Sequence, residues 1–207
     1  FVRSERGQAL DAAALTGNWI GQRRIEDLVD TILNTTSVLS LLVATVAIGF
    51  IALIRRRVAV ALGALLLIAG SNLTTQVLKR VIERPELGID LERASAGNSL
   101  PSGHATVAAS VAVALILVLP SRLRPTGAFV GTIGAAAVGV ATLSAGWHRP
   151  SDVIAALLIV GAWAGAVGLV VLVVEHRRRD VTANPPSGLA TGVLVLGGVL
   201  LLAGAAL

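Results

Sequence analysis

The sequence contains no cysteine and few charged residues. Without cysteine, the chain has no disulfide, no thiolate-bound zinc or haem, and no cysteine nucleophile. Only 14% of the 207 residues are charged, 55% are hydrophobic, and the mean hydropathy is +0.82. Soluble domains average about 25% charged and about 45–50% apolar residues. The composition therefore excludes an ordinary soluble domain and indicates an integral membrane protein.

The excess of positive charge has a topological explanation. A net charge of +5 and a pI of about 11.4 would also suit a nucleic-acid-binding protein. However, eight of the 17 basic residues lie in three short connectors between apolar runs, at 55–57, 121–125 and 176–179. Positive charge in such connectors is typical of cytoplasmic loops. We therefore predict membrane lipids as partners, no nucleic acid, and a cytoplasmic location for these connectors.

Six apolar runs indicate the fold class. They cover residues 37–54, 58–78, 105–119, 126–143, 153–174 and 189–207, and a spanning helix needs about 20 residues. We predict an all-α, polytopic transmembrane helix bundle with six spans.

The segment ahead of these runs, residues 1–36, has a mixed character. It carries charges at irregular spacing and apolar residues that include Leu10, Leu15 and Trp19. This pattern predicts an interfacial amphipathic helical segment with Trp19 as an anchor among the headgroups. The expected organisation is this segment, a transmembrane core over 37–174, and a cytoplasmic connector with an additional transmembrane helix over 175–207.

A polar, turn-prone segment opens the third run. Pro101 and Ser102 are helix-start signals, and Gly103 and His104 follow them. A helix start offers unpaired N–H groups and the positive end of the helix dipole, so it can bind an anion to which His104 could donate a proton. A plain helix cap at Ser102 is the alternative, and this segment alone leaves both interpretations open.

A second polar segment opens the fifth run, where His148 precedes Asp152 by four residues. On a helix these two share a face, so the carboxylate could accept one imidazole N–H and leave the other nitrogen as a nucleophile or base. A structural cap at Asp152 is the alternative. Because the basic connectors are expected inside, both polar segments are expected outside. Lys79 and Arg84, after the second run, suit either an anionic headgroup or simple snorkelling there.

Three segments resemble, in order, the signature motifs of the type 2 phosphatidic acid phosphatase family: Lys79 with Arg84-Pro85, Pro101-Ser102-Gly103-His104, and Gly146-Trp147-His148-Arg149-Pro150-Ser151-Asp152. That family includes undecaprenyl-diphosphate phosphatases and the soluble vanadium haloperoxidases. The resemblance covers residues from about 37 to 174, so the sixth run looks like an addition to the family core. Members normally have one more span upstream, and because the chain begins at Phe1 we expect further sequence before it.

The resemblance implies a metal-independent phosphatase without a cofactor, acting on a lipid phosphate or polyprenyl diphosphate through a phosphohistidine. The implied location is the cell membrane, with several spans and the active site on the extracytoplasmic side. His148 would attack phosphorus, Asp152 would orient it, and His104 would protonate the leaving oxygen. The residues expected to bind the substrate phosphate are Lys79, Arg84, Ser102, Gly103 and Arg149.

The sequence departs from the family pattern at two points. The lysine and Arg-Pro of the first motif are two residues closer together than usual. The Ser-Arg pair that normally opens the third motif falls on Ala141-Thr142, so an arginine is absent, and Arg149 or Arg93 could supply its charge. Two other functions stay open: a non-catalytic or transferase relative that binds lipid phosphates, and a metal-dependent hydrolase that uses His104, His148 and Asp152 as ligands.

Overall fold

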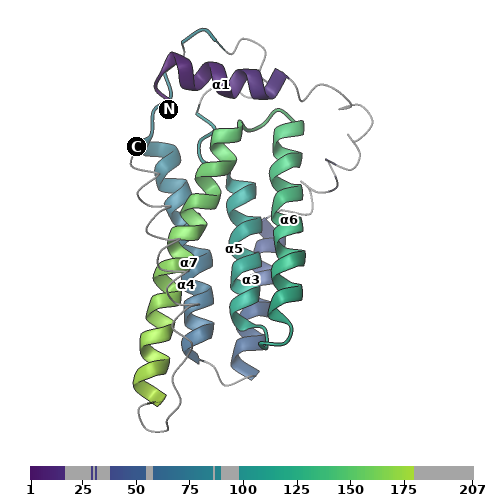
Figure 1. Cartoon of the computed structure of the whole chain (residues 1–207), viewed down its shortest axis with the longest axis vertical. Coiled ribbons are helices and arrows are strands. Elements are labelled where there is room, and N and C mark those ends of the chain that lie inside the picture. The colour runs from purple at the N-terminus through teal and green to yellow at the C-terminus, as the bar shows by residue number, and fades with distance from the viewer. Residues whose placement is uncertain are drawn as a thin grey trace.

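The computed structural model describes residues 1–16, 29, 31, 38–54, 58–85, 87–89 and 98–179, and this part of the chain is all-helical (Figure 1). Its helices are α1 (Glu5–Thr16), α3 (Val38–Ile54), α4 (Val58–Val81), α5 (Gly103–Val118), α6 (Arg124–Ser144) and α7 (Pro150–Arg179). Helices α3 to α7 run alongside one another, and α1 lies across one end of the bundle. The predicted all-α bundle is confirmed for these residues. Trp19, Arg93 and the sixth run lie outside the described residues.

Three of the described helices are long and apolar enough to cross a membrane: Val58–Val81, Arg124–Ser144 and Pro150–Val174. Helices α3 and α5 have 17 and 16 residues, and α5 is about 24 Å long at 1.5 Å per residue. The outer faces of α6 and α7 expose large apolar side chains such as Phe129, Ile133 and Leu169. Water would not favour such continuous apolar faces. They indicate a membrane protein, and the prediction of six spans stays a prediction.

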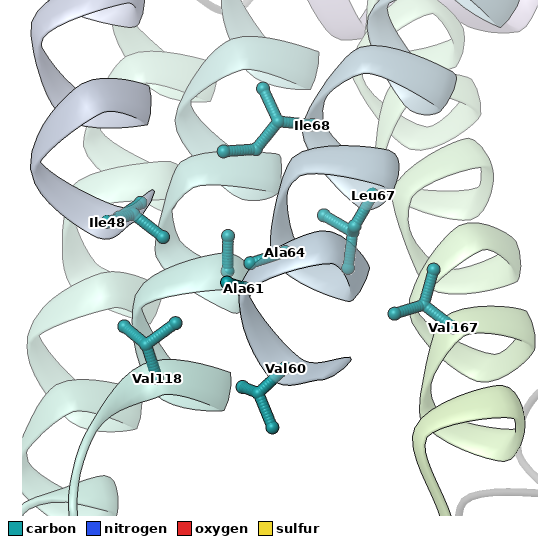
Figure 2. Packing of buried hydrophobic residues seen from close by; sticks show 9 residues of the cluster. Ile48, Val60, Ala61, Ala64, Leu67, Ile68, Val118 and Val167 are labelled. Carbon is teal, nitrogen blue, oxygen red and sulfur yellow. The ribbon is translucent and has the colours of Figure 1, made fainter. Parts of the chain in front are cut away.

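Helix α4 lies at the centre of the apolar core (Figure 2). Its buried residues pack against Ile48 of α3, Val118 of α5 and Val167 of α7. Close approach depends on glycine at Gly70, where a Cβ atom would lie only 2.6 Å from the Trp163 ring of α7. The Nε1–H of Trp163 also donates to the hydroxyl of Thr74 at 3.0 Å. These contacts set α4 firmly against α7.

Polar contacts align α4 with α5 near the end covered by α1. The hydroxyls of Thr75 and Thr106 lie 2.9 Å apart, and both side chains are fully buried. Lys79 comes one helical turn after Thr75, and Gly103 lies nearly one turn before Thr106. The contact between the two threonines therefore sets Lys79 beside the start of α5.

Helix α1 contacts the bundle through the polar side chains of Gln8 and Asp11, which are buried. The side-chain amide of Gln8 donates to the carbonyl oxygen of Pro85 at 2.8 Å. Leu10, which the sequence placed on an apolar face, is 56% exposed. The described part of α1 is therefore held on the bundle by polar groups, and the interfacial role of residues 1–36 stays a prediction.

Candidate active site

The start of α5 forms one wall of the site. Ser102 is the N-cap residue, and its hydroxyl accepts the N–H of Ala105 at 3.3 Å. The backbone N–H of Ser102 itself donates to the carbonyl oxygen of Asp152 at 2.9 Å. The predicted helix start is thus confirmed, and the two polar segments meet at the same end of the bundle. The first-turn N–H groups of α5 point out of the helix toward that meeting point.

A tight turn between α6 and α7 delivers the second histidine. Gly146 has a φ of +67°, a left-handed conformation that glycine adopts without a Cβ clash. Its N–H donates to the carbonyl of Leu143, and the N–H of Trp147 donates to that of Thr142. This pair of bonds is a Schellman motif. It ends α6 and turns the chain directly into His148 and Pro150, the first residue of α7.

Asp152 both caps α7 and contacts His148. Its Oδ2 accepts the backbone N–H of Arg149 at 2.9 Å, as the third residue of a capping box does. The same oxygen lies 3.4 Å from Nδ1 of His148 and accepts the hydroxyl of Ser99. Asp152 is fully buried and His148 is 7% exposed. The cap and the histidine contact, which the sequence offered as alternatives, therefore occur together.

Lys79, His104 and Trp147 complete the face of the site. A Cβ atom on Gly103 would lie 3.8 Å from Nζ of Lys79, so the ammonium group stands beside the start of α5. The rings of His104 and Trp147 have their centroids 5.6 Å apart, tilted by 47°. Two histidines, one ammonium group and a helix start are thus gathered together, a set that favours an anion.

The environment of His104 disfavours its charged form. His104 precedes the apolar run of α5, and burial lowers its pKa below the ordinary value of 6.5, with further lowering by the nearby charges of His148 and Lys79. In the free protein at neutral pH the imidazole is therefore mostly neutral. An anion bound between these groups would oppose both charge effects and favour protonation.

Arg84 lies on the other side of Asp152 from His148. Its Nη1 is 3.4 Å from Oδ1 of Asp152, and its Nη2 donates to Oδ2 of Asp11 in α1 at 2.6 Å. The side chain is 3% exposed, and its Nε has no acceptor among the described residues. The observed partners of Arg84 are thus carboxylates, and its predicted contact with a substrate phosphate stays a prediction.

Arg149 is the described residue that could supply the charge of the absent family arginine. It is 7% exposed, and its Nη1 lies 3.5 Å from the hydroxyl of Ser99. Thr142, at the position of that arginine, is fully buried and donates its hydroxyl to the carbonyl of Gly139. A phosphate contact by Arg149 stays a prediction.

Ser99 and Asp11 belong to the site, although the sequence reasoning gave them no role. Ser99 lies in the turn before α5 and could have been suspected from its place beside Pro101. Asp11 gave no signal, because its partners Arg84 and Ser151 are 73 and 140 residues away in the chain.

An apolar groove of about 620 Å³ adjoins the site between α1, α4 and α7. Its lining includes Asp11, Leu100 and Pro101, and Ile154 and Leu158 line it along α7. The part of the chain described holds no group of three or more histidine, cysteine, aspartate or glutamate side chains placed to hold a metal ion.

The fold and site define a class: a membrane-type helical bundle with a histidine–carboxylate pair set against an anion-binding helix start. The family model described as the PAP2 superfamily matches residues 59–179, more than half of the chain. The chain therefore belongs to the PAP2 superfamily, as the motifs predicted. Members of this superfamily are phosphatases, which supports a general phosphatase role. No curated protein and no solved structure matches the chain.

Proposed function

We propose that the protein is an integral membrane phosphatase that hydrolyses a lipid phosphate or polyprenyl diphosphate at the extracytoplasmic face. The observation that carries this proposal is the buried His148–Asp152 pair, which lies against the start of α5 in a member of the PAP2 superfamily. The basic connectors at 121–125 and 176–179 lie at the opposite end of their helices from this pair, which supports an extracytoplasmic site.

His148 is the proposed nucleophile. Asp152 faces Nδ1, so an N–H at Nδ1 leaves the lone pair of Nε2 free to attack phosphorus. The N–P bond forms as the bond from phosphorus to the lipid oxygen breaks, and that oxygen takes a proton from His104. A water molecule then attacks the phosphohistidine, gives a proton to the now neutral His104, and releases inorganic phosphate and free His148.

Charge stabilisation comes from the groups around the start of α5. Phosphoryl transfer depends mainly on positioning and on stabilising charge that is spread over three oxygens. We assign this role to the ammonium group of Lys79, the helix start at Ser102 and Gly103, and the guanidinium group of Arg149. A bound phosphate also restores the proton of His104, so the substrate itself generates the acid.

The apolar groove supports a lipid substrate. Leu100 and Pro101, which directly precede the helix start at Ser102, are among its lining residues, and Ile154 and Leu158 line it along α7. An acyl or prenyl chain would bury apolar surface there at about 25 cal/mol per Å². A free phosphate ester without such a chain would forgo this contribution.

The test is phosphate release by the purified protein in EDTA from a panel of lipid phosphates and diphosphates. We expect release from at least one lipid, inhibition by vanadate as a phosphate mimic, and loss of activity in His148→Ala. The exposed histidine at the far end of α7 provides the control, and His176→Ala should retain activity. Absence of release across the whole panel would refute the proposal.

A binding or transferase relative is the second candidate, and Thr142 at the position of the family arginine favours it. In that case the protein would bind lipid phosphates, and His148→Ala would leave any residual phosphate release unchanged. Transfer of the phosphoryl group to an acceptor other than water would appear as loss of substrate without matching release of inorganic phosphate.

A further inference from the structure

Asp11 is a fully enclosed carboxylate that the proposed mechanism does not use. It lies on α1, and its side chain is 2% exposed. Its Oδ1 accepts the backbone N–H of Ser151 at 3.1 Å, and its Oδ2 accepts the hydroxyl of Ser151 and a guanidinium N–H of Arg84, each at 2.6 Å. A buried carboxylate is costly without such partners, so these bonds join α1 directly to the first turn of α7.

The contacts continue from Asp11 to the proposed nucleophile. Arg84 bridges Asp11 and Oδ1 of Asp152, and Oδ2 of Asp152 faces His148. Both carboxylates contact the guanidinium group of Arg84, and the two oxygens of Asp152 are divided between Arg84 and His148.

Arg84 is well placed to orient Asp152. It lies on Oδ1, whereas the attacking nitrogen of His148 is on the far side of the imidazole ring from Oδ2. Its Nη groups are both occupied by carboxylates, and its side chain is 3% exposed. The ammonium group of Lys79, in contrast, stands at the start of α5.

We propose that Asp11 and Arg84 are positioning residues: α1, through Asp11, holds Arg84 against Asp152 and so fixes the orientation of the His148–Asp152 pair. This inference rests on the proposed function. Among the described residues, loss of Asp11 leaves Asp152 as the one carboxylate in contact with Arg84, which then draws Asp152 away from His148. Misplacement of about 1 Å in an active site can cost about 10²-fold in rate.

The experiment compares Asp11→Asn with Glu5→Gln. Both remove one negative charge from α1 at nearly constant size, but Glu5 is exposed, whereas Asp11 is buried. We expect Asp11→Asn to lower kcat by about 10- to 100-fold with vanadate inhibition unchanged, and Glu5→Gln to resemble the wild type. In an Arg84→Gln background, Asp11→Asn should add little, because it acts through Arg84.

Three outcomes would overturn the inference. If the kcat of Asp11→Asn equals the kcat of Glu5→Gln, α1 does not position the site. If vanadate binds more tightly to Asp11→Asn, Asp11 competes with phosphate for Arg84 instead. If Arg84→Gln weakens vanadate inhibition as strongly as it lowers kcat, Arg84 binds phosphate directly.

A second measurement does not depend on activity or on one variant. The imidazole nitrogen signals of the three histidines, recorded by NMR at one fixed pH, should shift for His148 and stay constant for His176 in Asp11→Asn. If Asp11→Asn does not fold, Ser151→Ala removes one bond to Asp11 and should give a smaller shift of the same sign. If the His148 signal does not shift in Asp11→Asn, the positioning role is refuted, whether or not the wild type releases phosphate. If the wild type releases no phosphate but the His148 signal does shift, only the proposed function is refuted.

Discussion

The replacement Asp152→Asn tests the centre of the proposed site. It keeps the size of the side chain and removes its charge. In the wild type the carboxylate accepts the hydroxyl of Ser99 and the N–H of Arg149, and it faces Arg84 and His148. An amide can accept the first two bonds with its oxygen, but it cannot balance the arginine or an imidazolium that forms during the reaction.

The expected loss of rate follows from this geometry. The equivalent Asp→Asn change in a Ser-His-Asp triad lowers kcat by about 10⁴ because the histidine takes the wrong tautomer. Here Oδ2 and Nδ1 are 3.4 Å apart, longer than the usual charge-assisted bond of about 2.7–2.9 Å. We therefore expect a decrease nearer 10²- to 10³-fold, with vanadate inhibition little changed.

Stability should fall as well, because the replacement leaves Arg84 without one of its two carboxylates in a buried setting. Hydrogen bonds to charged groups contribute about 1.5–3 kcal/mol each, so we expect a loss of about 3 kcal/mol in the free energy of unfolding. The assay pairs phosphate release in EDTA with thermal unfolding of the same detergent-purified sample. A folded Asp152→Asn protein that retains half of the wild-type kcat would refute the assigned role of this carboxylate.

Two further predictions concern His104, the proposed acid, and the turn that precedes His148, the proposed nucleophile. His104→Asn should lower kcat by about 10²- to 10⁴-fold, with His176→Asn as the control, and an unchanged kcat would exclude His104 as the acid. Because its folded pKa is lowered, His104 binds fewer protons in the folded state than in the unfolded state, so its contribution to stability falls as pH drops below about 6.5. His104→Asn should flatten that fall, as measured by thermal unfolding between about pH 5 and 7. Gly146→Ala should cost about 1 kcal/mol or more in stability, because the φ of +67° at this position disfavours a Cβ atom. The control is Gly165→Ala, since a Cβ atom at Gly165 meets nothing within 4 Å. Equal melting temperatures of the two variants would refute this account.

Local patterns explain why much of the molecule was predictable from the sequence. Apolar runs predicted helices because burial in a helix or a membrane depends on composition over a short window. The five runs between 37 and 174 coincide with α3 to α7. Local geometry also explains the spacing of His148 and Asp152 and the N-cap at Ser102. The alternation of antiparallel helices explains why the two polar segments share one end of the bundle. Helix length was less predictable, since α7 extends to Arg179, beyond the apolar run that ends at residue 174.

Contacts between distant segments were decided by the tertiary structure alone. The hydroxyl of Ser99 reaches Asp152 across 53 residues of chain, and Asp11 reaches Arg84 across 73. No periodicity or motif spacing encodes such pairs, because they depend on how α1 crosses the end of the bundle and on where α4 ends beside α7. The sequence by itself determined the class of protein and the one-turn spacing of His148 and Asp152, since both depend on short-range patterns. Only the packing of whole helices decided which buried charges surround that pair.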